Sequence, residues 1–189
     1  MLKDLVLQCR SYRRFDQSAA VPAQVLRDLV DTARLTASAA NAQALRFRIV
    51  NTPELCAQVF PTIRWAAALK DWDGPAEGER PSAYIVIACD LSIGKNKQWD
   101  DGIAAQTILL GAVEKGYGGC MIGSFQRGEL AAVLGLNPEQ YSLDLVLAIG
   151  KPREKVILVP LNQDGSTTYY RDENGVHYVP KRSLEDVLL

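Results

Sequence analysis

The stretch DDGIAAQTILLGAVEKGYGGCMIGSF, residues 100–125, joins a long apolar segment to a run of glycines. Residues 103–113 are apolar nearly all round, and only three residues interrupt them. Acidic residues precede this segment, while Lys115 and Gly116 follow it, which suits the macrodipole of a helix and a glycine stop. A helix that is apolar on every face is buried in a core or an interface. We therefore expect a central helix here.

Four glycines stand within the eight residues from Gly116 to Gly123. Glycine permits unusual backbone angles and leaves amide groups able to face a ligand. The run follows a predicted helix and not a strand, so it is not the fingerprint of a Rossmann dinucleotide site. We expect the backbone of residues 116–125 to present N–H groups to a ligand.

The rest of the chain mixes helices and strands without regular βαβ alternation, which favours an α+β fold with a mostly antiparallel sheet. No compositional break divides the chain, so residues 1–189 are predicted to form a single domain. Hydrophobic periodicity and turn residues predict the following elements: helices over 21–37 and 128–136, a helix over 53–72 broken at Pro61, a loop over 71–81, strands over 45–51, 83–90 and 142–152, a hairpin about Asn174-Gly175 and a final helical turn over 183–189.

Composition excludes several classes of function. A net charge of −1 argues against nucleic acid as the main partner, because such proteins need a basic face. No apolar run approaches the roughly 20 residues of a membrane span, and the first ten residues lack the pattern of a signal peptide. We expect a cytoplasmic protein with no membrane partner.

The chain is poor in residues that hold metals or act as nucleophiles. Its four cysteines include no CxxC pair, and His177 is its one histidine, so we expect no metal site. The same histidine count weighs against Ser-His or Cys-His catalysis. Any chemistry is expected to come from a bound cofactor.

Three polar clusters remain as candidate binding residues. CRSYRRFD, residues 9–16, holds three arginines within five positions, and guanidinium groups suit phosphate or carboxylate. SAANAQ, residues 38–43, places amide side chains among small residues that let a flat ligand approach. VPKRS, residues 179–183, adds a basic pair near the C-terminus. Each cluster alone is equally compatible with a solvated turn, a polar loop or a solvated terminus.

In this order, RSYRRFD, SAANAQALRF, the 100–125 stretch and VPKR resemble the FMN-dependent nitroreductase family. The loop and strand GPAEGERPSAYIVIACD also look familial, so the resemblance covers most of the chain. It implies a nitroreductase-like fold in an intertwined homodimer, with one FMN in each of two pockets at the subunit interface.

The resemblance also implies roles for individual residues. Arg10 and Ser11 match positions that hold the FMN phosphate and ribityl chain, and Arg13 matches a cation beside the flavin pyrimidine edge. The backbone N–H of Gly123 matches the group that points at flavin N5. The remaining matches are Met121 and Ile122 on the same wall, Ser38, Asn41 and Gln43 in a loop that comes in part from the partner subunit, and Lys181 and Arg182 in the basic pair that completes the phosphate site.

Two departures from the family pattern bear on the site. Many relatives have a basic residue where Cys9 stands, so one phosphate contact is absent or comes from Lys181 and Arg182. Relatives often carry Pro-Trp in place of Ala44-Leu45, which affects the shape of the loop. The chain is also short for the family.

The implied function is hydride transfer from NAD(P)H, through bound FMN, to a nitroaromatic, quinone or related oxidised acceptor. No side chain need act as a nucleophile, because the cofactor carries the redox chemistry. Two alternatives stay open: a flavoenzyme of the same fold with another reaction, such as metabolite dehydrogenation or reductive dehalogenation, and a non-catalytic FMN-binding protein. The sequence does not distinguish NADH from NADPH.

Overall fold

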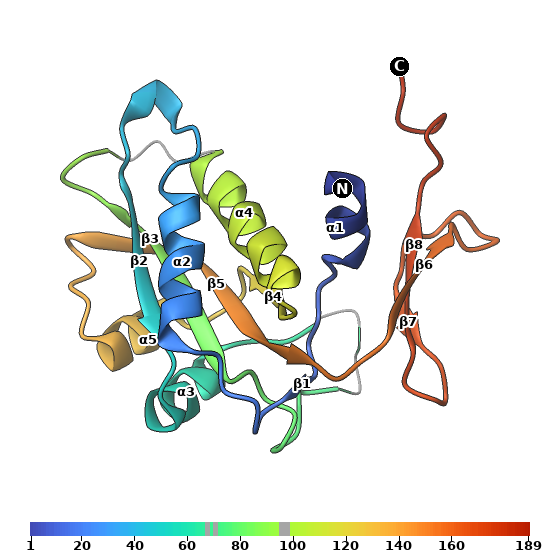
Figure 1. The fold of residues 1–189 in the computed structure, drawn as a ribbon, viewed down its shortest axis with the longest axis horizontal. Helices are drawn as coiled ribbons and strands as arrows, with labels where there is room; N and C mark the ends of the chain where they lie inside the picture. The colour runs from blue at the N-terminus through green and yellow to red at the C-terminus, as the bar shows by residue number, and fades with distance from the viewer. Residues whose placement is uncertain (67–68, 70–71, 95–98) are drawn as a thin grey trace.

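The computed structural model describes residues 1–66, 69, 72–94 and 99–189, and its centre is an antiparallel sheet (Figure 1). The strand order is β1-β5-β3-β2, and β4 also pairs with β5. All four pairings in this sheet are antiparallel, which confirms the predicted α+β class. The strands are β1 Phe15–Asp16, β2 Leu45–Val50, β3 Ala83–Asp90, β4 Gly118–Ile122 and β5 Tyr141–Pro152.

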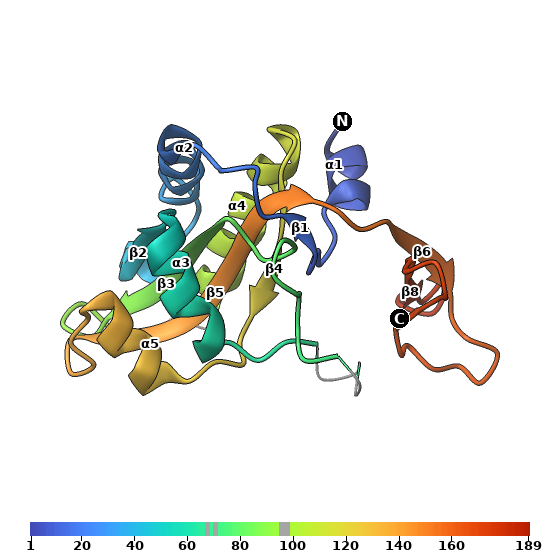
Figure 2. The ribbon, with the colours of Figure 1, turned by 90° about the horizontal axis from the view of Figure 1, so that it is seen from below.

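Helices cover both faces of the sheet. On one face Ile85 and Ile87 of β3 pack with α2 (Ala23–Ala33) and α4 (Asp100–Glu114). On the other face Tyr84 and Val86 pack with α3 (Pro53–Val59) and α5 (Arg127–Leu134). Figure 2 shows these two layers on opposite sides of the strands. Every residue of β3 is therefore buried, as its continuous apolar run predicted.

The central helix is confirmed as α4. Five of its apolar residues are buried, while Ile103 is 40% exposed. The helix stops where expected, because Gly116 takes a left-handed φ of 79° and its N–H donates to the Val113 carbonyl.

Residues 118–122 form strand β4, an element that the sequence did not reveal. Gly118 and Gly119 serve close packing and not unusual backbone angles. A Cβ on Gly119 would lie 2.4 Å from the Ala148 carbonyl oxygen, and one on Gly118 would lie 2.5 Å from the Tyr12 ring. The glycines let the strand lie against its neighbours.

Other predicted elements meet mixed outcomes. Helix α3 ends at Val59, and a 3₁₀ turn follows over Phe60–Thr62. The predicted helix over 53–72 does not resume through Ala66, and residues 67–68 and 70–71 lie outside the described ones. The N-terminus forms a short helix, α1 (Leu2–Gln8), with no buried residue.

Residues 153–189 form a C-terminal arm that projects away from the sheet (Figures 1 and 2). The predicted hairpin is confirmed, because β7 (Tyr170–Arg171) pairs antiparallel with β8 (His177–Lys181). Strand β6 (Val156–Pro160), which the sequence did not reveal, runs parallel to β8. The last residues form a hydrogen-bonded turn at 184–187 and not a longer helix. Within the described residues, no helix has both the length and the apolar character of a membrane span.

Candidate functional site

A cavity of about 230 Å³ lies at the end of β4, and the structure brings four of the predicted site residues to it. They are Arg13, Met121, Ile122 and Gly123. Gly123 faces open space, since a Cβ placed on it would meet no atom within 4 Å. Six further described residues, which sequence reasoning missed, also line it: Arg64, Trp65, Ala66, Cys120, Ser124 and Tyr169.

The wall beside Gly123 is held by backbone contacts. The N–H of Arg64 donates to the carbonyl of Ser124 at 2.9 Å, and Ile63 forms an antiparallel bridge with Phe125. This pairing carries the Arg64 side chain, which is exposed, to the rim of the cavity. Contacts between segments far apart in sequence therefore build the wall.

Arginine and aromatic side chains set the chemistry of the cavity. The Arg13 guanidinium donates to the Ser11 carbonyl at 3.2 Å and lies 5.2 Å from the centre of the Tyr169 ring. The indole N–H of Trp65 is buried and has no hydrogen-bond partner in the described part of the chain. Among the described lining residues there are two guanidinium groups and no carboxylate, so the cavity favours a flat ligand with an electron-rich or anionic edge.

The one cysteine among the described lining residues is not an activated nucleophile. Burial raises the pKa of the Cys120 thiol, so the thiol stays protonated near neutral pH. Among residues 1–66, 69, 72–94 and 99–189, no group of three or more His, Cys, Asp or Glu side chains is placed to hold a metal ion.

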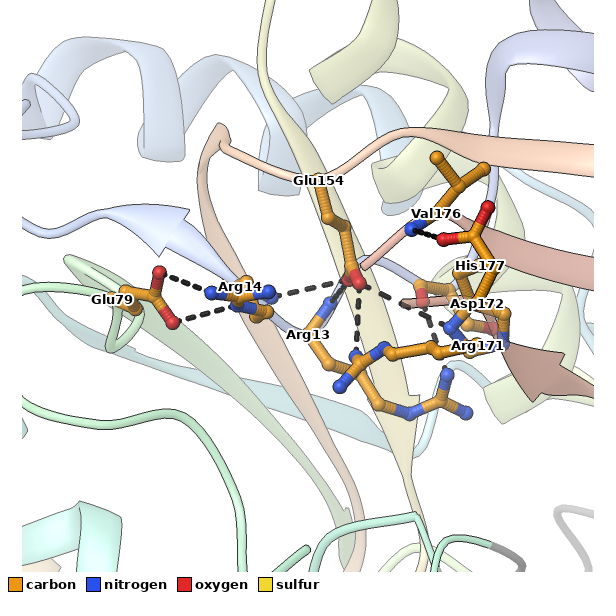
Figure 3. Close-up of polar contacts among 9 residues, drawn as sticks. Arg13, Arg14, Glu79, Glu154, Arg171, Asp172, Val176 and His177 are labelled. Carbon is orange, nitrogen blue, oxygen red and sulfur yellow. Dashed lines mark hydrogen bonds and ion pairs between the residues drawn. The ribbon is translucent and has the colours of Figure 1, made fainter. Parts of the chain in front are cut away.

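The backbone of Arg13 is fixed by a buried carboxylate, as Figure 3 shows. Glu154 accepts hydrogen bonds from the N–H groups of Arg13 and Arg14, the latter at 3.2 Å. Its other oxygen lies 2.9 Å from the Arg171 guanidinium. Arg14 itself turns to Glu79, which it binds through two hydrogen bonds of 2.6 Å.

His177 lies beside this carboxylate in the arm. Its Nδ1 is 3.9 Å from Glu154, its ring packs on Tyr169, and its side chain is 1% exposed. Burial lowers the pKa of His177 from 6.5 to about 4, and the nearby Arg13 and Arg171 charges act in the same direction. The histidine is therefore neutral near pH 7, and no feature of the sequence indicated this burial.

The predicted phosphate-binding residues lie outside the cavity lining. Arg10 donates to the Val6 carbonyl at 2.6 Å, and its Nε is buried without a hydrogen-bond partner among the described residues. Ser11 forms a parallel bridge with Gly119 of β4. Lys181 and Arg182 are exposed at the end of β8, in the arm. The basic residues predicted to bind phosphate are thus divided between the N-terminal segment and the arm.

The predicted loop residues Ser38, Asn41 and Gln43 lie elsewhere in the chain. Ser38 and Gln43 line a separate cavity of about 180 Å³, which shares no residue with the cavity at Gly123. The Ser38 hydroxyl donates to Asp100 at 2.7 Å and accepts from the backbone N–H of Gln43 at 3.0 Å.

The backbone of this loop is unusual. Ala40, Asn41 and Gln43 have φ values of 51°, 52° and 54°, a left-handed conformation that is rare outside glycine. Asp100 fixes the loop at its start, because it also accepts from the Ala39 N–H at 2.9 Å. Hydrogen bonds therefore hold the loop in a defined conformation, but its residues do not line the cavity at Gly123 of the same chain.

Comparisons with known proteins agree with this architecture. The model of the nitroreductase family matches residues 6–83 and 95–151, well over half of the chain. Protein DrgA of Synechocystis sp. (strain ATCC 27184 / PCC 6803 / Kazusa) is 28% identical, over 80% of this chain and 84% of its own.

Two solved structures share the fold. A nitroreductase-like protein of Desulfovibrio desulfuricans, solved in complex with FMN, aligns with a TM-score of 0.71 at 22% identity, over 100% of this chain and 95% of its own. An NAD(P)H:FMN oxidoreductase-like protein of Staphylococcus epidermidis aligns with a TM-score of 0.70 at 16% identity, over 100% and 95%. With the family match, these results show that the chain belongs to the nitroreductase family.

Proposed function

We propose that the protein is an FMN-dependent oxidoreductase whose flavin binds in the cavity at Gly123. The observation that carries this proposal is the gathering of Arg13, Met121, Ile122 and Gly123 around one cavity, whose described lining holds two guanidinium groups and no carboxylate. Bound FMN would supply hydride transfer from NAD(P)H to a nitroaromatic, quinone or related oxidised acceptor.

The residues present fit this cofactor. The open space at Gly123 leaves room for a flat ring close to the backbone. The buried N–H of Trp65 at the cavity and the buried Nε of Arg10 are donors without partners in the described chain, and a ligand rich in acceptors would satisfy such groups. FMN offers carbonyl oxygens at one end and a phosphate at the other.

The protein's own groups would bind and orient the cofactor. The Arg13 guanidinium would lie beside the pyrimidine edge and stabilise negative charge there, and the Gly123 N–H would donate to N5. Arg10 and Ser11, with Lys181 and Arg182, would hold the phosphate and ribityl chain. Because the buried Cys120 thiol stays protonated, it takes no part as a nucleophile.

We also propose that the site is completed in a homodimer. Three features support this: the arm projects from the body of the chain (Figure 1), Ile103 of α4 is exposed, and the loop with Ser38, Asn41 and Gln43 is remote from the cavity. In a dimer, that loop of a second copy would approach the flavin.

Absorbance and assay test the proposal directly. The purified protein should be yellow, behave as a dimer in size-exclusion chromatography and carry about one FMN per chain. It should oxidise NADH or NADPH when menadione or a nitrofuran is added. A colourless monomer that takes up no added FMN would contradict the proposal, and FMN binding without turnover would indicate a non-catalytic flavoprotein.

Arg10→Ala tests the phosphate site. Removing a charge-assisted contact should weaken FMN binding by about 1.5–3 kcal/mol, or roughly 10- to 150-fold, in a fluorescence titration. Arg48→Ala, which removes an exposed arginine of β2, is the matched control and should leave affinity unchanged. Equal affinities for both variants would mean that Arg10 belongs to a solvated turn.

A further inference from the structure

Glu154 occupies the bend where the chain leaves β5 and enters the arm. Its side chain is 1% exposed, although the bend itself lies at the edge of the sheet. A carboxylate buried to this degree needs charged partners and hydrogen-bond donors to offset its lost hydration. The groups that bind Glu154 come from two different parts of the molecule.

The first partners belong to the N-terminal segment. One oxygen of Glu154 accepts the N–H groups of both Arg13 and Arg14. The adjacent N–H of Arg153 donates to the Arg14 carbonyl at 2.9 Å. The backbone that carries the cavity arginine is therefore fixed to the bend, independently of the contacts of the Arg13 side chain.

The second partners belong to the arm. Arg171 of β7 gives the 2.9 Å ion pair with Glu154, is itself 15% exposed and lies 4.4 Å from the centre of the Trp72 ring. Next to the bend, the N–H of His177 donates to the Lys155 carbonyl at 2.9 Å. Figure 3 shows the carboxylate between the Arg13 backbone and the Arg171 guanidinium.

The arm returns to the cavity through Tyr169. This ring lines the cavity, lies under the Arg13 guanidinium at 5.2 Å and packs on the His177 ring with 5.2 Å between centroids. Arg13 is thus held from below by Tyr169 and along its backbone by Glu154. Both contacts depend on where the arm lies.

We propose that Glu154 is a positioning residue that sets the Arg13 guanidinium at the cavity and the orientation of the arm as one unit. Lys181 and Arg182 lie on that arm, so Glu154 also controls how they meet the N-terminal basic residues. The consequence for FMN rests on the proposed function, whereas the coupling between arm and N-terminal segment does not.

Two variants separate the two sets of contacts. Glu154→Gln keeps an oxygen that can accept from the Arg13 and Arg14 amides but loses the charge that pairs with Arg171. Glu154→Ala removes both. Glu79→Gln is the matched control, because the hydrogen bonds of 2.6 Å that the Glu79 carboxylate accepts come from the Arg14 guanidinium, and it interacts with Arg153 and Arg171 of the arm only through its charge.

Amide hydrogen exchange, measured without FMN, tests the coupling between the arm and the N-terminal segment directly. We expect exchange at the arm amides, His177 included, to rise by about tenfold or more in both Glu154 variants, and exchange at the Arg13 and Arg14 amides to rise only in Glu154→Ala. The Glu79→Gln protein should exchange like the wild type at the arm. If Glu154→Ala does not fold, Glu154→Gln and Arg171→Met, which both break the ion pair, decide the question at the arm.

Flavin titration and potentiometry measure how the Glu154 variants affect FMN binding and the potential of the bound flavin. Glu154→Gln should raise the Kd for FMN by about tenfold and lower the midpoint potential of the bound flavin, since the cation at its edge is displaced. Wild-type exchange at the arm in Glu154→Gln, or an equal increase in Glu79→Gln, would overturn the coupling. A wild-type protein that takes up no FMN would overturn the proposed function alone, because the exchange result is independent of flavin.

Discussion

The central sheet and the C-terminal arm are stabilised by different forces. Every residue of β3 is buried, and apolar side chains from both helical layers cover it. In the arm, no residue of β6 is buried, and β8 buries only His177 and Pro180. The arm is instead anchored by the buried Glu154–Arg171 pair. A change in the sheet should therefore act through packing, whereas a change in the arm should act through charge.

The largest effect is expected in the sheet. Ile87 of β3 is fully buried between β2, β5 and the α2–α4 layer. Ile87→Ala should lower the free energy of unfolding by about 2–5 kcal/mol, because it removes apolar contacts and leaves a cavity. Urea denaturation measures this as a lower midpoint. A loss below about 0.5 kcal/mol would mean that the sheet is not the main source of stability.

A smaller effect should distinguish two glycines on the same segment. Gly119→Ala places a Cβ 2.4 Å from a backbone carbonyl oxygen, so β4 or β5 must shift, and we expect a loss of about 1–3 kcal/mol in urea denaturation. Gly123→Ala is the control. Its φ is not left-handed and its Cβ meets nothing, so stability should change by less than about 0.5 kcal/mol. Equal losses at both positions would contradict the packing role of Gly119.

The difference between the two regions also explains which parts of the fold could be predicted from the sequence. The apolar runs at 83–90 and 103–113 predicted a covered strand and a buried helix because the hydrophobic effect needs no particular partner. The strand at 118–122 was not predicted, because glycine in a strand that packs closely looks the same in sequence as glycine in a loop.

The polar cluster of the arm could not be predicted in this way. Glu154 stands among the charged residues of KPREK, where nothing marks it as buried. Its partners lie 141 and 17 residues away along the chain, and only the folded backbone brings them together. Likewise Tyr169 reaches Arg13 through the path of the arm. Of the residues predicted by resemblance, the structure gathers Arg13, Met121, Ile122 and Gly123, and assembly of the others stays a prediction about the dimer.

The last predicted effect comes from the charge balance of the arm and depends on pH. Because burial lowers the pKa of His177 from 6.5 to about 4, the unfolded chain binds a proton over this range that the folded chain does not bind. The contribution of neutral His177 is fully present above pH 6.5 and is lost as the pH falls toward 4. Protonation would place a third positive charge beside Arg13 and Arg171, whereas the charge of the nearby Glu154 acts in the opposite direction and favours the proton.

His177→Phe keeps an aromatic ring against Tyr169 but removes the titrating group. Between about pH 7 and pH 5, the wild type should therefore lose about 1.5–2 kcal/mol more stability than the variant, as measured by urea denaturation at each pH. The lowered pKa values of Asp16 and Glu79 make both proteins less stable at acid pH. This loss is the same in the wild type and the variant, so it cancels when their stabilities are compared at each pH. Parallel pH profiles would show that His177 takes up its proton as readily in the folded arm as in the unfolded chain. In that case the region around Glu154 is open to water, and the arm is anchored less tightly than its burial indicates.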